Sequence, residues 1–348
     1  MRHALFATAA AGLLAAAIGA GATAAPAPGG SNAFQVTKEV ADTEAAGAPV
    51  TDPDLVNAWG ISQAPGGAFW LSDNHTSKST LYDRRTFDKL GLVVDIPAPG
   101  GGGGAPTGTV FSPFSGSGAF GGAIFLFVTE DGAIETWKGG TTAAIAVDNS
   151  ADGAIYKGMA LATHQDQPRL FATNFGQGRV EMYDADFTHI GDFTDPALPA
   201  GYTPFNVQAL AGQIYVTFAK RKGDADDETS GPHLGYVDVF DTAGHLIKQL
   251  VAKDDLNAPW GLMIAPKGFG GFEGDLLVGN FGDGHINVYD RTTGAHLGML
   301  KNAGGDPIAI EGLWGLAPGP KSSVVFSAGP NDEANGLLGT ITFAGSAP

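Results

Sequence analysis

A block of sequence recurs along this chain at intervals of about fifty residues, and this repeat constrains the fold more than any other feature. The run LLVGNFGDGHINVYD at residues 276–290 is echoed by LFATNFGQGRVEMYD at residues 170–184. A Trp-Gly-hydrophobic opening recurs at Trp59, Trp260 and Trp314. A period of this length, with several short strands in each unit, is typical of a β-propeller.

Each repeat divides into four predicted strands, and the chain accommodates six repeats. The predicted blades span residues 55–97, 106–147, 155–195, 204–251, 257–301 and 311–343. The last blade ends one strand short, and the strand-like run at residues 33–40 can supply the missing strand. We therefore predict an all-β, six-bladed β-propeller with four-stranded blades, in which the N-terminal strand joins the last blade and closes the ring.

The first residues of the chain carry the pattern of an export signal. Arg2 and His3 precede an apolar run at residues 4–20, and an Ala-Thr-Ala cleavage pattern follows it. We predict a signal peptide at residues 1–24 and a single propeller domain at residues 25–348, in an exported protein that is periplasmic or extracellular. The alternative is an uncleaved membrane anchor, and no later segment has the length of a membrane span.

The charge balance excludes several classes of partner. The chain has 36 acidic residues against 19 lysines and arginines, which gives a net charge of −17 at pH 7. Such acidity argues against nucleic acid and anionic membrane surfaces as partners. Cysteine is absent, so an exported chain of this kind depends on core burial rather than on disulfides. We expect a monomer.

An acidic insertion, KRKGDADDETSGP at residues 220–232, interrupts the fourth repeat. Its carboxylates belong to Asp224, Asp226, Asp227 and Glu228. Clustered carboxylates can hold Ca²⁺, because this hard cation prefers oxygen ligands. The spacing does not match a calcium-binding loop, so we favour a solvated, charged loop as the interpretation.

Four blades carry an oxygen-bearing side chain just before the innermost predicted strand. These residues are Asn57, Asn206, Asn257 and Glu311. Equivalent positions of a propeller converge on one mouth of the central channel, where one carboxylate and three amide oxygens, with waters, would suit Ca²⁺. The alternative, which we favour, is that the asparagines cap loops through hydrogen bonds to nearby backbone.

Candidate ligand-binding residues lie next to these positions. Lys157 occupies the corresponding place in the third blade, and Trp59, Trp260 and Trp314 each follow a mouth position. The three indoles would offer faces for stacking on a sugar, but we favour packing between blades for them. The sequence shows no catalytic motif, since it lacks cysteine, a G-x-S-x-G turn and the H-E-x-x-H zinc pattern.

Three blocks resemble a family of secreted bacterial β-propeller proteins of uncharacterised function, namely residues 51–74, the fifth repeat and residues 327–341. Some members of that family carry a PEP-CTERM sorting tail, which this sequence does not show, so surface anchoring is not expected. The blade pattern is more remotely similar to NHL-type and gluconolactonase-like propellers. The latter place Ca²⁺ on Glu, Asn and Asp residues at about the channel positions described above, and the resemblance implies no catalytic residues.

The sequence thus favours an exported, acidic propeller that serves as a binding module, with a glycan or another exported protein as its partner. A first alternative is a Ca²⁺-dependent hydrolase of lactones or related esters, in which Glu311 and the three asparagines would hold the ion. A second alternative is a structural scaffold of the envelope or matrix. Whether the protein is an enzyme stays open at this stage, and the only cofactor implied is Ca²⁺ under the first alternative.

Overall fold

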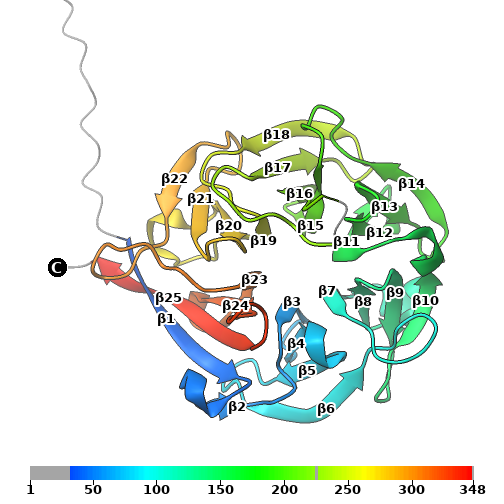
Figure 1. The fold of residues 1–348 in the computed structure, drawn as a ribbon, viewed down its shortest axis with the longest axis horizontal. Helices are drawn as coiled ribbons and strands as arrows, with labels where there is room; N and C mark the ends of the chain where they lie inside the picture. The colour runs from blue at the N-terminus through cyan, green and yellow to red at the C-terminus, as the bar shows by residue number, and fades with distance from the viewer. Residues whose placement is uncertain (1–31, 224–225, 347–348) are drawn as a thin grey trace, which may run out of the picture. The chain divides into compact units, whose positions relative to one another are not determined.

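The computed structural model describes residues 32–223 and 226–346 of the chain. The predicted signal peptide at residues 1–24 lies outside this part, as does Asp224 of the acidic insertion. The described residues form six sheets, which follow one another around a common centre (Figure 1). No helix in the described part is long and apolar enough to cross a membrane.

Five sheets are four-stranded, and they correspond to the first five predicted blades. Blade one contains β3 (Ala58–Gln63), β4 (Phe69–Asp73), β5 (Lys78–Tyr82) and β6 (Lys89–Asp95). Blade two contains β7 (Pro106–Phe111), β8 (Phe125–Thr129), β9 (Ala133–Trp137) and β10 (Ala144–Asp148). Blade three contains β11 (Tyr156–His164), β12 (Gln167–Asn174), β13 (Arg179–Tyr183) and β14 (His189–Phe193).

The next two blades repeat this order. Blade four contains β15 (Tyr202–Leu210), β16 (Gln213–Lys220), β17 (Gly235–Phe240) and β18 (Leu246–Ala252). Blade five contains β19 (Pro259–Ile264), β20 (Leu276–Asn280), β21 (Ile286–Tyr289) and β22 (His296–Met299). Short 3₁₀ turns lie in the connections, at Glu44–Ala46, Asn74–Thr76, Ser115–Ser117, Ala119–Gly122, Ser150–Asp152, Gly270–Phe272 and Pro320–Ser322.

The sixth blade is built from both ends of the described chain. Its sheet has the order β2-β1-β25-β24-β23, with β23 (Leu313–Pro318), β24 (Val324–Ala328) and β25 (Leu337–Ser346) from the C-terminal end. From the N-terminal end, β1 (Asn32–Ala41) pairs antiparallel with β25, and Val36 lies opposite Ile341. The predicted closure is therefore confirmed. The short β2 (Val50–Thr51) adds a fifth strand, parallel to β1, which the four-stranded expectation did not include.

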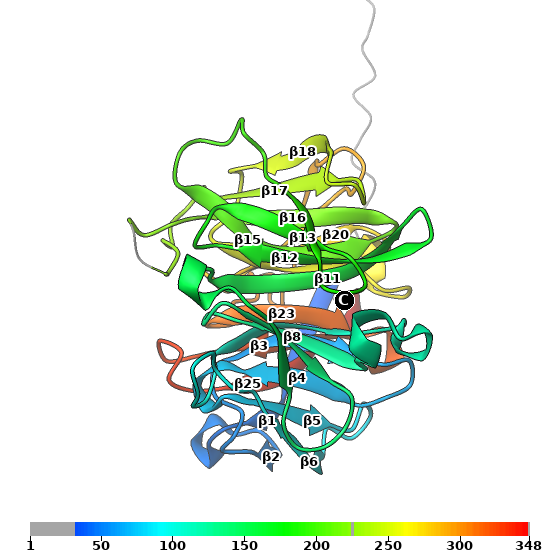
Figure 2. The same ribbon diagram turned by 90° about the vertical axis from the view of Figure 1, so that its right-hand side faces the viewer.

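The innermost strands β3, β7, β11, β15, β19 and β23 surround the centre, and each contacts the next around the complete ring. Figure 2 shows the blades from the side, with the connecting loops at the ends of the strands. The glycine of the Trp-Gly repeat permits this close approach. A Cβ atom at Gly60 would lie 2.6 Å from the carbonyl oxygen of Thr107, and one at Gly315 would lie 2.6 Å from that of Trp59. A side chain at these positions would push neighbouring blades apart.

The third strand of each of the first five blades buries a polar side chain two residues before its final aromatic residue. These side chains belong to Thr80, Glu135, Glu181, Asp238 and Asn287. Because alternate residues of a strand share one face, each lies on the same face as the aromatic residue that packs against the adjoining blade. We call this place the third-strand polar position.

Glu135 and Asp238 occupy the third-strand polar position without any hydrogen-bond partner for their carboxyl oxygens among the described residues. Burial, with a smaller effect from Asp131, raises the pKa of Glu135 to about 8. Burial and the neighbouring Asp195 raise the pKa of Asp238 to about 8. Glu181 differs, because hydrogen bonds from Tyr156, Tyr183 and Asn174 outweigh its burial and lower its pKa. Both Glu135 and Asp238 are therefore protonated in the folded protein at neutral pH.

Loss of β1 should open the ring. Deletion of residues 33–40 would expose the edge of β25, so we expect aggregation or a much lower melting temperature. Within β1, Phe34 is 2% exposed and its ring centroid lies 4.7 Å from that of Phe269. Phe34→Ala should destabilise the fold by about 3–5 kcal/mol, whereas Gln35→Ala, at an exposed position of the same strand, serves as the control. An unchanged thermal melt for the deletion variant would contradict the closure.

Stability should decline as the pH rises, because of the two buried acids. Carboxyls of this kind have unfolded-state pKa values of about 4, so the raised folded-state values of Glu135 and Asp238 favour the protonated, folded protein. Their contribution is complete below about pH 4 and is lost as the pH rises towards about 8. Thermal melts of Glu135→Gln and Asp238→Asn from pH 5 to pH 9 should show a flatter profile than the unmodified protein. A profile as steep as that of the unmodified protein would count against neutral burial.

Candidate functional site

The candidate site lies at the mouth of the central channel, where loops from several blades meet. The loops that precede β3 and β19 bring Asn57 and Asn257 to or near this mouth, and Lys157 reaches it from the start of β11. The connections from the second to the third strand of blades two, four and six add Glu130, Glu228 and Glu333. Carboxylates therefore reach the mouth from three separate blades.

Asn57 is fully buried and links several of these loops. Its side-chain amide donates a hydrogen bond of 2.7 Å to Glu333 Oε2, and its Oδ1 accepts one of 2.9 Å from Trp314 Nε1. Its Nδ2 also lies 3.4 Å from His75 Nε2. Asn57 thus fixes Glu333 and His75 at the mouth, a role more extensive than the capping of its own loop.

Lys157 places a buried positive charge in the channel. Its side chain is 2% exposed and forms an ion pair with Glu130. The other carboxylate oxygen of Glu130 accepts a hydrogen bond of 2.9 Å from Asn74 Nδ2. The ammonium nitrogen lies 5.0 Å from the ring centroid of Trp59, within the range of a cation–π contact. Burial alone would lower the pKa of Lys157, but Glu130 and Glu228 outweigh this effect and raise it. The lysine stays charged at neutral pH.

Glu228 and Glu333 line the same cavity at the mouth. Burial, only partly offset by Lys157, raises the pKa of Glu228 to about 7, and Glu333 adds to the rise. Burial also raises the pKa of Glu333, against the hydrogen bond from Asn57. Three consecutive residues, Asn331 to Glu333, have left-handed backbone angles, and this tight curl of the loop directs Glu333 at Asn57. The two glutamates therefore hold a proton more tightly than exposed carboxyls do.

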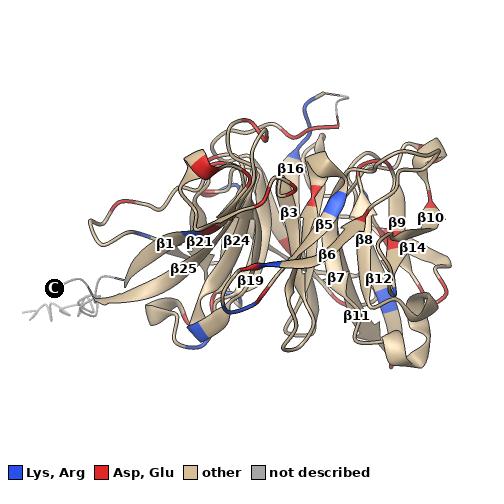
Figure 3. Cartoon of the chain, turned by 90° about the horizontal axis from the view of Figure 1, so that it is seen from below, with Lys and Arg blue, Asp and Glu red and all other residues tan. Residues whose placement is uncertain are grey.

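A cavity of about 710 Å³ opens at this mouth. Acidic residues outnumber basic ones in its lining, as they do over the chain as a whole (Figure 3). The acidic lining residues are Asp227, Glu228, Asp283, Glu311, Asp332 and Glu333, and Lys222 and His75 are the basic ones. Phe281, stacked on Trp314 with 4.0 Å between the ring centroids, adds an aromatic face.

The four predicted calcium ligands have separate partners. Asn206 donates a hydrogen bond of 2.7 Å to the carbonyl oxygen of Trp260 and accepts one of 2.8 Å from the Val207 amide. Asn257 accepts a hydrogen bond of 2.6 Å from the Gly231 amide and donates one of 3.1 Å to Asp283. Glu311 is exposed and accepts 2.8 Å from the Asn331 amide. No hydrogen bond between described residues joins two members of the set, and the calcium site stays a prediction.

The three predicted stacking residues form one buried cluster around the channel. Trp59, Trp260 and Trp314 are at most 3% exposed. Trp59 stacks on Trp314 with 3.5 Å between centroids, and Trp260 meets Trp59 edge-on at 5.9 Å. Their burial fits the packing interpretation, and a direct contact of these indoles with a ligand stays a prediction.

Several residues of the mouth were missed in the sequence. Glu130, Glu333 and His75 follow the second strand of their blades, whereas the predicted site residues lie near the start of the first strand. Both sets of loops lie at the same end of a blade, so the Thr-Glu-Asp and Asn-Asp-Glu runs carried a usable signal. Glu228 belongs to the acidic insertion, which folds back through a bridge between Arg221 and Glu228 and so reaches the mouth.

Solved structures share the fold at low sequence identity. Virginiamycin B lyase from Staphylococcus aureus matches with a TM-score of 0.56 and 9% identity, covering 89% of this chain and 99% of that one. A PQQ-bound aldose sugar dehydrogenase from Streptomyces coelicolor has a TM-score of 0.54, 15% identity and coverage of 91% and 99%. A luciferin-regenerating enzyme has a TM-score of 0.54, 12% identity and coverage of 85% and 94%. These likenesses show a shared propeller fold.

No protein-family model matches the chain, and three proteins of Acanthamoeba polyphaga mimivirus are similar to it in sequence. Uncharacterized protein R648 of Acanthamoeba polyphaga mimivirus is 28% identical over 309 residues, which cover 84% of this chain and 76% of that protein. The expected likeness to a bacterial family is thus corrected to a propeller with viral relatives. Uncharacterized protein L690 of the same virus is 30% identical over 314 residues, covering 83% of this chain and 81% of its own length, and this chain belongs to the same protein family as L690.

Proposed function

We propose that the protein is a binding module that takes a cationic ligand at the acidic mouth of its central channel. The observation that carries this proposal is the lining of the 710 Å³ cavity, in which six carboxylates face Lys222 and His75 as the basic side chains. A cavity walled by protein focuses the field of such charges and raises the local concentration of oppositely charged ligands.

The arrangement of charges leaves acidic groups available to a ligand. Lys157 forms an ion pair with Glu130, so its positive charge is already neutralised within the protein. Burial raises the pKa values of Glu228 and Glu333, and a neighbouring glutamate adds to each rise, Glu333 for Glu228 and Glu130 for Glu333. Both carboxylates would therefore gain from an added positive charge. Phe281 in the cavity wall provides an aromatic face for the same charge.

The ligand class follows from these contacts. An ammonium or guanidinium group would pair with the carboxylates, and a lysine or arginine of another exported protein presents one on a flexible stem. An amino-sugar glycan offers the same chemistry. A neutral glycan would need several exposed aromatic faces, whereas the three indoles of the channel are buried and the cavity lining offers the ring of Phe281.

The Ca²⁺-dependent hydrolase remains the alternative, with weaker support. Its proposed ligands Asn206 and Asn257 already have hydrogen-bond partners for both side-chain atoms. Glu311, the carboxylate of that set, accepts a hydrogen bond of 2.8 Å from the Asn331 amide. The scaffold alternative gives no reason for partly buried carboxylates around a cavity.

Titration with a hexalysine peptide, followed by calorimetry, tests the proposal. We expect the double variant Glu228→Gln/Glu333→Gln to bind the peptide at least tenfold more weakly, because each charge-assisted contact contributes roughly 1.5–3 kcal/mol. The double variant Asp166→Asn/Glu273→Gln changes the charge equally at positions outside the cavity lining, and should bind as the unmodified protein does.

If both double variants bound hexalysine with equal affinity, net charge alone would explain the weaker binding, and the proposal would be contradicted. A Ca²⁺ titration monitored by the melting temperature distinguishes the Ca²⁺-dependent hydrolase from the proposed binding module. Stabilisation by Ca²⁺ that Glu311→Gln abolishes would support the hydrolase-type site instead.

The affinity for a cation should rise with pH across neutrality. Glu228, with a pKa of about 7, is mostly protonated at pH 6 and mostly ionised at pH 8, so the attraction grows as the proton leaves. We expect hexalysine to bind up to about tenfold more tightly at pH 8 than at pH 6. Glu228→Gln should flatten this dependence, whereas a dependence that survives the substitution would assign the titration to another group.

A further inference from the structure

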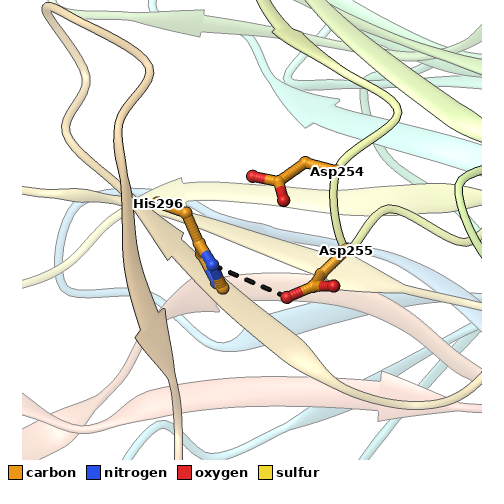
Figure 4. A group of neighbouring side chains, drawn as sticks. All are labelled: Asp254, Asp255 and His296. Atoms are coloured by element: carbon orange, nitrogen blue, oxygen red, sulfur yellow. Dashed lines mark ion pairs between the residues drawn. The ribbon is translucent and has the colours of Figure 1, made fainter.

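A second cluster of polar side chains lies between blades four and five, away from the cavity lining. Asp254 and Asp255 precede β19, and His296 begins β22. Each offers one ligand atom, and these atoms lie within 4.8 Å of one another (Figure 4). We propose that these three residues bind a divalent transition-metal ion of the Zn²⁺ type, independently of the function proposed for the channel mouth.

Blade one shows how the fold treats a similar pair of acids. Asp52 and Asp54 precede β3 there, and Lys89 lies opposite Tyr82 in the register of the sheet. The Lys89 ammonium lies 2.6 Å from Asp52 Oδ1 and 2.8 Å from Asp54 Oδ2. In this blade a lysine of the chain itself neutralises the two carboxylates.

Blade five replaces that lysine with a histidine. His296 lies opposite Tyr289 just as Lys89 lies opposite Tyr82. Its Nδ1 is 3.5 Å from Asp255 Oδ2, and this is the ion pair that Asp255 makes among the described residues. An imidazole is neutral through much of the physiological pH range and is a common metal ligand. The two carboxylates thus face a metal ligand where blade one has a permanent cation.

The second lysine of blade one is replaced in the same way. Lys78 begins β5 and pairs with Asp54 at 2.5 Å. The residue four positions before Tyr289, as Lys78 is before Tyr82, is His285. Its Nδ1 lies 3.6 Å from Asp283 Oδ1, so it pairs with a different carboxylate. No lysine or arginine of the described residues forms an ion pair with Asp254 or Asp255.

A buried hydroxyl without a partner points to the same place. Tyr289 is 0% exposed, and its hydroxyl makes no hydrogen bond among the described residues, whereas the Tyr82 hydroxyl donates 2.6 Å to Asp52. The ring of Tyr289 contacts that of His296, with 5.1 Å between centroids. A buried, unpaired polar group of this kind calls for an explanation such as an ion or its water.

Buried amide oxygens add to the unsatisfied acceptors. Asn280 and Asn287 each donate 2.8 Å to the backbone carbonyl of Asp255, which places both side chains beside this segment. Their Oδ1 atoms are buried and have no partner among the described residues. Waters on a metal ion bound by Asp255 would supply donors to such oxygens.

The donor set selects the kind of metal. Two carboxylate oxygens and one imidazole nitrogen, with a water, complete the four-coordinate arrangement that Zn²⁺ favours. Ca²⁺ and Mg²⁺ prefer sites made of oxygen atoms alone. Ligand atoms in a tetrahedral Zn²⁺ site lie about 3.4 Å apart, given bond lengths of about 2.1 Å, so small side-chain rotations would close the cluster on an ion.

Calorimetric titration of the full chain with ZnCl₂ tests the site. We expect His296→Ala and Asp255→Asn each to weaken Zn²⁺ binding at least tenfold. His285→Ala removes a neighbouring histidine outside the set and should leave the affinity unchanged. Equal weakening by His285→Ala, or unchanged binding in His296→Ala, would overturn the assignment, as would Ca²⁺ binding that His296→Ala does not alter.

His296→Lys separates metal binding from folding. This variant restores the arrangement of blade one, in which a lysine pairs with the two acids. We expect it to abolish Zn²⁺ binding while the melting temperature without metal stays the same or rises. Retained Zn²⁺ binding in a folded His296→Lys protein would show that the ion binds elsewhere.

Discussion

The antiparallel pairing of β1 with β25 is the constraint on which the other features depend. It joins the two ends of the described chain in one sheet, and so holds β23 against β3 and completes the circle of innermost strands. The mouth of the channel exists only because that circle is closed, since Asn57 from blade one meets Glu333 and Trp314 from blade six across the seam. The candidate site therefore forms only when the ring closes.

Buried charge is handled differently at each place in the ring. Lys157 is paired with Glu130, and Glu181 is surrounded by hydrogen-bond donors, so both stay ionised in spite of burial. Glu135 has no such partner and stays neutral. The same backbone register therefore accepts an ion, a neutral acid or an amide, depending only on the neighbours that the adjoining loop supplies.

The sequence was sufficient for the fold because the repeat, the strand periodicity and the missing last strand all bear on local pairing and chain length. It was insufficient for the mouth because the relevant contacts join residues far apart in the chain, such as Asn57 and Glu333. The prediction of Asn57 as a mouth residue came from its place before β3. Glu228 was considered only within its own insertion, and nothing local in the sequence indicates that this insertion folds towards Lys157.

The seam also sets an order on how the molecule can form. Phe34 pairs with Phe343, and Ala41 with Leu337, so the first described strand lacks its antiparallel partner until nearly the whole chain has emerged from the ribosome. Blades one to five contain only hairpins between neighbours in sequence and can assemble as they are made. The final joining requires a loop closure over almost the full length of the chain, which is the slow kind of contact. Until then only the end of β1 at Val40 and Ala41 has a partner, in β2, and the rest of the strand is exposed to aggregation during synthesis.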